Sequence, residues 1–161
     1  MPRVYVALGS NVEPERHLTM AVQAMRGRFG PIILSPVYRN EAIGFEGEDF
    51  LNAVAGFDCE LDVAGLKSAL DRIERDCGRQ RGAARFAPRT LDLDLLLYGE
   101  RVDAAAKLPR SEILQYNFML KPLADIAATE HHPLTGQTYA EHWAGFAGEG
   151  GALTPVSLAG L

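Results

Sequence analysis

Two carboxylates that lie two residues apart carry the clearest chemical signal in this sequence. From Leu91 onward, leucines alternate with Asp92 and Asp94, which is the period of a half-buried strand. Alternate residues of a strand face the same side, so both carboxylates project together from Cα atoms roughly 6.6 Å apart. Such a pair suits magnesium, which takes its remaining ligands from water and substrate phosphates. The same pair could instead solvate an exposed strand and discourage edge pairing.

A run of arginines lies just before this strand. Four arginines fall within the eleven residues 79–89, which contain no Asp or Glu, although the whole chain has a formal net charge of -5. Guanidinium groups bind phosphate oxygens through paired hydrogen bonds. An arginine cluster alone could equally be a solvated surface or a nucleic-acid patch. Beside two carboxylates, however, it favours nucleotide triphosphate chemistry. The four residues are Arg79, Arg81, Arg85 and Arg89.

An expected strand over residues 50–57 holds a second kind of candidate. Phe50 and Asn52 lie two apart and therefore face the same side of this strand. The aromatic ring could stack on a flat heterocycle while the amide hydrogen-bonds to its edge. Packing in the core is the competing interpretation of Phe50. The preceding residues 40–49 contain two glycines and several acidic side chains, which predicts a loop.

Composition and length limit the classes of protein that need to be considered. A chain of 161 residues with 47% hydrophobic and 23% charged residues is expected to form one globular domain. The net negative charge argues against bulk affinity for nucleic acid or anionic membranes. No apolar run is long enough to cross a membrane, and the N-terminus lacks a signal-peptide layout. We therefore expect a cytoplasmic protein, with Cys59 and Cys77 as free thiols.

The order of expected elements predicts the fold class. Strand, helix, strand, strand, helix, strand is the order of a split βαβ unit. We therefore predict an α+β, ferredoxin-like antiparallel sheet with helices packed on one face and active-site loops on the other. Pro14 and Asp62 are expected at the starts of the two helices, with Gly30 and Gly78 ending them.

Three further local predictions concern turns and the end of the chain. The sequence Gly-Ser-Asn at 9–11 is interpreted as a tight turn, with ligand contact as the less favoured alternative. Pro122 is expected at the start of a helix. Residues 147–161 are glycine-rich and lack periodicity, so we expect a domain over 1–146 followed by a loosely packed tail without catalytic residues.

The segment around the two carboxylates also resembles a known family. Residues 88–94 read Pro-Arg-Thr-Leu-Asp-Leu-Asp, and an apolar run then leads to Gly99. This pattern resembles the signature of the 6-hydroxymethyl-7,8-dihydropterin pyrophosphokinases of the folate pathway. The resemblance extends from Gly9 to near Ala127, which is most of the chain. It implies transfer of pyrophosphate from ATP to the hydroxymethyl group of the reduced pterin, release of AMP, and two magnesium ions.

The resemblance also implies a role for each candidate residue. Asp92 and Asp94 would hold the Mg2+ ions, and Arg79 and Arg89 would neutralise charge on the transferred group. The ATP-binding residues would be Arg72, Glu74, Arg81, Arg85 and Arg110, and the pterin-binding residues Ile43, Phe50, Asn52 and Phe118. We expect a monomer whose partners are these two small molecules, without nucleic acid or membrane.

The sequence departs from the family pattern at several points. Arg110 follows Pro109 where many members have His, and Tyr116 stands in place of a common Arg. We hypothesise that Arg110, together with Lys121, supplies the missing positive charge. The other departures are Phe86 in place of Trp, Asp71 in place of Gln, and Glu41-Ala42-Ile43 in a loop that has lost its prolines.

Two alternative functions are open at this stage. A ferredoxin-like module could bind RNA through the arginine run, but its strands lack an aromatic-rich RNA-recognition signature. A member of the family could also bind pterin or ATP without turnover. The intact Asp92, Asp94, Arg79 and Arg89 argue against that alternative.

Overall fold

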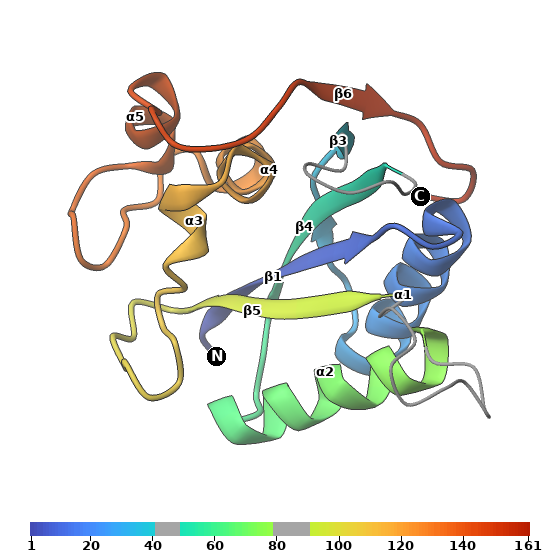
Figure 1. Ribbon diagram of the computed structural model, residues 1–161. Coiled ribbons are helices and arrows are strands. Elements are labelled where there is room, and N and C mark those ends of the chain that lie inside the picture. The colour runs from blue at the N-terminus through green and yellow to red at the C-terminus, as the bar shows by residue number, and fades with distance from the viewer. Residues whose placement is uncertain (41–48, 79–90) are drawn as a thin grey trace.

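The computed structural model describes residues 1–40, 49–78 and 91–161 (Figure 1). A central antiparallel sheet separates a layer of long helices from a group of shorter ones. The strands are β1 (Arg3–Ser10), β2 (Ile33–Leu34), β3 (Val37–Asn40), β4 (Phe50–Asp58), β5 (Asp92–Tyr98) and β6 (Leu153–Val156). The helices are α1 (Pro14–Phe29), α2 (Val63–Gly78), α3 (Glu112–Gln115), α4 (Asn117–Ala127) and α5 (Tyr139–Ala144).

The order of the strands confirms the predicted α+β class and the ferredoxin-like topology. The sheet runs β5-β1-β4-β3-β6, and β2 pairs with β4 beside β3. Every pairing is antiparallel. β2 and β3 are one strand interrupted at Ser35 and Pro36, because proline cannot donate a backbone hydrogen bond to the ladder.

Both ends of α1 and the start of α2 lie where their local sequence signals predict. Pro14 is the first residue of α1, and Gly30 ends that helix with a φ of 84°, which glycine adopts without steric cost. Asp62 caps α2, since its Oδ1 accepts a hydrogen bond of 2.8 Å from the Gly65 N–H. These local interactions explain why helix boundaries were predictable without tertiary information.

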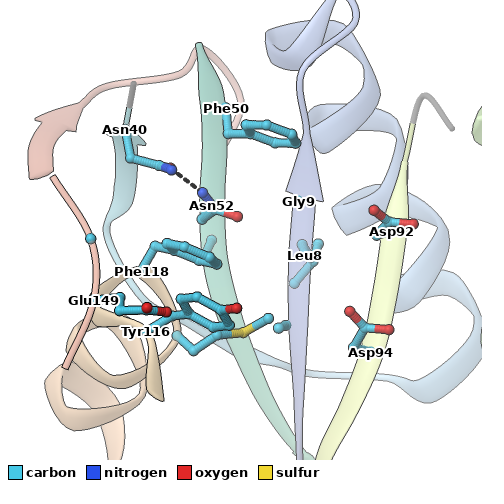
Figure 2. Close-up of a pocket in the computed structure, with 14 residues that line it drawn as sticks. Leu8, Gly9, Asn40, Phe50, Asn52, Asp92, Asp94, Tyr116, Phe118 and Glu149 are labelled. Atoms are coloured by element: carbon cyan, nitrogen blue, oxygen red, sulfur yellow. Dashed lines mark hydrogen bonds between the residues drawn. The ribbon is translucent and has the colours of Figure 1, made fainter. Parts of the chain in front are cut away.

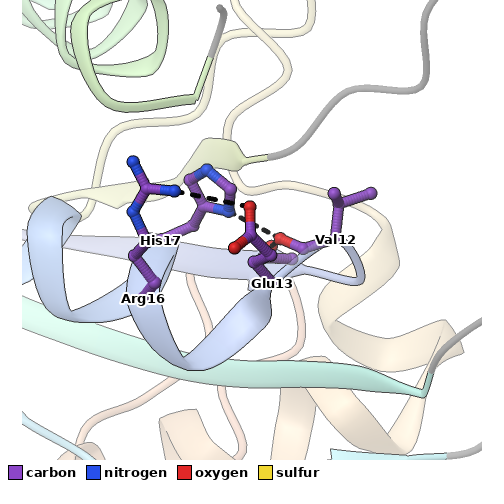
Figure 3. A network of polar contacts seen from close by, with 5 residues as sticks. Val12, Glu13, Arg16 and His17 are labelled. Atoms are coloured by element: carbon purple, nitrogen blue, oxygen red, sulfur yellow. Dashed lines mark hydrogen bonds and ion pairs between the residues drawn. The ribbon is translucent and has the colours of Figure 1, made fainter.

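The connection from β1 to α1 is built from short-range polar contacts (Figure 3). Nδ1 of the buried His17 lies 2.5 Å from the Val12 carbonyl oxygen, and the His17 N–H donates to the Glu13 carbonyl over 3.1 Å. Arg16 forms an ion pair of 3.4 Å with Glu13. The predicted turn at 9–11 is wrong for Gly9 and Ser10, which belong to β1 because both pair with β4.

One face of the sheet is closed by α1 and α2. Val4, Val6 and Leu8 of β1 point into this layer, as do Leu93 and Leu95 of β5. The helices contribute Leu18, Val22, Met25, Leu66 and Leu70, each at most 2% exposed. This continuous apolar layer is the main hydrophobic core.

The predicted packing of helices on one face holds for α1 and α2, and α4 in addition covers part of the second face. There, Tyr5, Ala7 and Val54 lie against Leu120 and Leu123 in a second core. β5 becomes apolar on both sides after Asp94, so its C-terminal half requires cover on both faces. α4 supplies that cover. The N-terminal half of β5 carries the polar side chains described below.

Two smaller corrections concern the C-terminal third. Pro122 lies inside α4 rather than at its start, since the helix already begins at Asn117. The tail is not loosely packed throughout, because Leu153–Val156 form β6 along β3. Their antiparallel register supplies backbone hydrogen bonds that the weak periodicity of the tail did not indicate. The domain boundary at residue 146 stays a prediction.

Within residues 1–40, 49–78 and 91–161, no helix combines the length and the apolar character that a membrane span requires.

Candidate active site

A cavity of about 640 Å³ opens on the second face, beside the part of the sheet that α4 leaves uncovered. Figure 2 shows Asp92 and Asp94 along one side of it, and aromatic rings together with Glu149 along the other. It is lined by Ala7, Leu8, Gly9, Asn40, Phe50, Asn52, Ala53, Asp92, Asp94, Tyr116, Phe118, Met119, Glu149 and Gly150. The cavity therefore joins strands from the middle of the sheet to residues far along the chain.

The floor of the cavity is a row of residues that crosses three strands. Gly9 of β1 pairs with Asn52 of β4 on one side and with Asp92 of β5 on the other. A Cβ on Gly9 would lie 2.9 Å from Oδ1 of Asn52, so a side chain there would displace this amide. Glycine thus keeps open the space between an amide and a carboxylate.

The carboxylate side of the cavity has the arrangement that the strand period predicts. Asp92 and Asp94 project from β5 toward the same cavity (Figure 2). Nη2 of Arg110 lies 3.5 Å from Oδ1 of Asp94, and its Nε lies 3.2 Å from Oε2 of Glu112. The Arg110 side chain is 17% exposed, which strengthens its charge interactions relative to those of a fully solvated arginine. A cation therefore already lies beside Asp94.

The donor set fits a magnesium ion that shares its ligands with a substrate. Within residues 1–40, 49–78 and 91–161, no group of three His, Cys, Asp or Glu side chains could hold a metal. Two carboxylates on one strand leave most coordination positions for water and phosphate oxygens, as magnesium prefers in nucleotide sites.

The aromatic side of the cavity contains both predicted pterin-stacking residues. Phe50 and Phe118 come from β4 and α4 and line the same space (Figure 2). Tyr116 stacks on Phe118 with ring centroids 5.0 Å apart and an interplanar angle of 17°. Asn52 donates a hydrogen bond from Nδ2 to Oδ1 of Asn40. This contact fixes the amide orientation, and both residues remain part of the cavity lining.

The other predicted nucleotide residues lie outside this cavity lining. Oε1 of Glu74 accepts a hydrogen bond of 3.4 Å from the Leu93 N–H, which places α2 next to β5. Arg72 is exposed on α2. Lys121 forms an ion pair of 2.8 Å with Asp125 and does not line the cavity. Five predicted residues lie outside the described residues: Ile43, Arg79, Arg81, Arg85 and Arg89.

Several lining residues were missed as site residues by sequence reasoning. Gly9 was interpreted as part of a turn, although its position at the end of an apolar strand was the available signal. Tyr116 was noted only as a departure from the family pattern. Glu149 and Gly150 lie in the segment expected to be an uninvolved tail, and no local pattern connects them to the site. The other lining residues that were missed are Ala7, Leu8, Asn40, Ala53 and Met119.

Comparison with known proteins identifies the class. A model of the 7,8-dihydro-6-hydroxymethylpterin-pyrophosphokinase family matches residues 5–128. A 2-amino-4-hydroxy-6-hydroxymethyldihydropteridine pyrophosphokinase of Pseudomonas aeruginosa is 40% identical over 134 residues, covering 78% of this chain and 80% of the relative. Its counterpart in Haemophilus influenzae is 35% identical over 134 residues, covering 80% and 83%.

The chain belongs to the 7,8-dihydro-6-hydroxymethylpterin-pyrophosphokinase family. It is an enzyme of pyrophosphoryl transfer in folate biosynthesis, as the family resemblance of residues 88–99 predicted.

Proposed function

We propose that this enzyme takes pyrophosphate from ATP, transfers it to the hydroxymethyl oxygen of 6-hydroxymethyl-7,8-dihydropterin, and releases AMP. The observation that carries this assignment is the row of Asn52, Gly9 and Asp92 across the cavity floor. A flat ring that hydrogen-bonds to the Asn52 amide at one end can extend its substituent over Gly9 toward the Asp92 carboxylate.

The aromatic side of the cavity is the proposed pterin site. The ring stacks between Phe50 and Phe118, where its faces exchange water for aromatic surface. Asn52 and backbone groups near Ile43 hydrogen-bond to its polar edge. The bond of Asn52 to Asn40 supports this role, because it holds the amide in one orientation before the substrate arrives.

The carboxylate side is the proposed site of two magnesium ions. Asp92 and Asp94 would hold them, with the remaining ligands coming from water and the triphosphate. When bound, magnesium withdraws charge from the phosphate oxygens and stabilises the charge that develops during transfer. The two carboxylates also position the substrate hydroxyl for attack.

The reaction forms a bond between the hydroxymethyl oxygen and the β-phosphorus and breaks the bond from that phosphorus to the oxygen bridging to the α-phosphate. AMP departs with the bridging oxygen, and the hydroxyl proton passes to solvent. Arg79 and Arg89 neutralise the transferred group in this proposal. Positioning and electrostatic stabilisation supply most of the acceleration, as in phosphoryl transfer generally.

Arg110 is proposed to orient the triphosphate. The Arg110 guanidinium lies beside Asp94 and also pairs with Glu112. A triphosphate whose magnesium ion is held by Asp94 would therefore lie close to this guanidinium. The other proposed nucleotide residues are Arg72, Glu74, Arg81 and Arg85. Lys121 is a weaker candidate, since Asp125 already pairs with it.

The cellular setting proposed for the enzyme follows from composition and from the absence of a membrane-spanning helix among residues 1–40, 49–78 and 91–161. We propose a cytoplasmic monomer whose partners are ATP and the pterin, with no nucleic acid bound.

Product analysis tests the proposed reaction. The purified protein is incubated with magnesium, ATP and 6-hydroxymethyl-7,8-dihydropterin, and nucleotide and pterin products are separated. AMP and the pterin pyrophosphate should appear in equal amounts, and Asp94→Ala should abolish both. Asp58→Ala is the matched control, because Asp58 pairs with Arg3 at the end of β4 and does not line the cavity.

Other outcomes would contradict specific parts of the proposal. ADP in place of AMP would mean that the γ-phosphorus is attacked. Tight ATP binding without any pterin product would indicate a family member that has lost turnover. Products that do not depend on magnesium would reject the role assigned to Asp92 and Asp94.

A further inference from the structure

A short C-terminal segment is hydrogen-bonded to the start of α4. The Glu149 N–H donates to the Gln115 carbonyl over 2.8 Å, and the Asn117 N–H donates to the Glu149 carbonyl over 2.9 Å. Nδ2 of Asn117 donates to the Gly151 carbonyl over 2.7 Å. We call residues 148–151 the C-terminal clasp. Its bonds to residues 115–117 join two segments that lie more than thirty residues apart.

The clasp can approach α4 this closely because residue 150 is a glycine. Gly150 has a φ of 137°, and a Cβ there would lie 1.8 Å from Oδ1 of the buried Asn117. No side chain fits this space without moving Asn117. Gly27 of α1, outside the clasp, provides a contrast, since a Cβ built on it would meet nothing within 4 Å.

The residue held by the clasp lies between two aromatic side chains of the cavity. Asn117 separates Tyr116 from Phe118, and these two rings stack on each other. Glu149 and Gly150 line the same cavity (Figure 2). A displacement of the Asn117 side chain would break its bond to Gly151 and disturb the segment that carries both rings, together with part of the cavity wall.

We infer that the C-terminal clasp is a positioning element for the pterin, which holds Phe118 and Tyr116 in the orientation that stacking requires. The inference rests on the proposed function, because it assigns the pterin to this wall. The family match ends at residue 128 and does not include the clasp. The carboxylate side lies on β5, which the clasp bonds do not involve.

A pair of glycine variants tests the inference in the full-length protein. Gly150→Ala should raise the KM for 6-hydroxymethyl-7,8-dihydropterin by about tenfold to a hundredfold, as expected for a misplaced binding group. The KM for ATP should stay within about twofold. Gly27→Ala should leave both constants at the wild-type values. A merely structural role would move both constants together or neither.

A second measurement needs no variant and therefore does not depend on whether Gly150→Ala folds. If the clasp favours pterin binding, the pterin must in turn stabilise the clasp. Hydrogen exchange of the Asn117 and Glu149 amides is compared with α,β-methylene ATP alone and with this analogue plus the pterin. The pterin should slow both amides by at least about fivefold. The Gly99 amide, which bonds to the Arg3 carbonyl at the far end of β1, should not change.

The outcomes separate this inference from the proposed function. If the wild-type protein forms AMP and pterin pyrophosphate while Gly150→Ala matches Gly27→Ala in pterin KM, the inference is wrong and the proposed function stands. If Gly150→Ala does not fold, unchanged exchange at Asn117 and Glu149 overturns the inference by itself. A wild-type protein without the pterin product would reject the proposed function and, with it, the inference.

Discussion

The two faces of the sheet are built from the same strands but differ in what they leave open. The face under α1 and α2 is filled along its whole length by apolar side chains. The second face is filled only where α4 lies, and beyond α4 the cavity lining includes amides, glycines, carboxylates and aromatic rings. Stability is therefore expected to depend mainly on the first face, and chemistry on the uncovered half of the second.

Strand β5 shows the division within one element. Leu93 and Leu95 point into the closed core, while Asp92 and Asp94 project into the cavity. Successive side chains of a strand alternate between its two faces. The packed leucines on one face of β5 therefore fix the positions of the two aspartates on the other. Substitutions on opposite faces of β5 should therefore separate turnover from stability.

The largest effect is expected for Asp94→Asn. It should lower kcat about a thousandfold, or roughly 4 kcal/mol of transition-state stabilisation, because a neutral amide holds magnesium poorly. The free energy of unfolding should change by less than about 1 kcal/mol, since the ion pair with Arg110 is partly solvated. Steady-state kinetics and urea unfolding measure the two quantities. A loss of stability as large as the loss of activity would contradict the division between faces.

The opposite pattern is expected for Leu66→Ala in the closed core. Leu66 is fully buried under the sheet, so its truncation should lower the free energy of unfolding by about 3 kcal/mol. At a temperature where the variant is still folded, the KM for both substrates should match the wild-type values. Chemical unfolding checks the first statement and kinetics the second. A selective rise in one KM would show that this face also shapes the site.

Phe118→Ala probes the aromatic side of the open face. Loss of one stacking partner should weaken pterin binding by about 1 to 3 kcal/mol. Calorimetric titration with the pterin measures this, with ATP affinity as the internal control. Unchanged pterin affinity would reject the placement of the ring between Phe50 and Phe118.

Arg110→Ala should have a smaller effect that is confined to the nucleotide. Removing this cation should raise the KM for ATP about tenfold, equivalent to roughly 1.4 kcal/mol. Arg110→Lys restores the charge without the paired donors and should recover part of the affinity. Wild-type ATP affinity in Arg110→Ala would disprove the hypothesis that this residue replaces a missing family cation.

The smallest effect concerns pH and lies away from the site. Burial of the His132 side chain lowers its pKa below the ordinary value, and the nearby charge of His142 lowers this pKa further. The unfolded chain then binds more protons than the folded protein as the pH falls below about 6.5, so stability is lost on acidification. Thermal unfolding at pH 7 and pH 5.5 should show a smaller loss for His132→Asn. An equal loss in both proteins would exclude His132 as the cause.

Local interactions made much of the fold predictable. The period of two placed Asp92 and Asp94 on one side, and Pro14, Gly30 and Asp62 marked helix boundaries through contacts within a few residues. The order of elements then indicated the ferredoxin-like sheet. Each of these signals depends on neighbours along the chain and is therefore visible in the sequence.

Other features required contacts between distant segments. The sequence did not indicate that α4 would cover the second face, because an apolar helix does not specify the surface it will bury. Pairing of β6 with β3 likewise depends on backbone groups that every residue carries.

The amino-acid sequence by itself therefore determined the acidic pair, the long helices and the family, since these follow from periodicity, capping and a continuous motif. Only the tertiary structure decided that Gly9 would open the cavity floor and that Glu149 and Gly150 would complete its wall. Their roles depend on which side chains approach from other strands and helices, and long-range packing, not local preference, selects those neighbours.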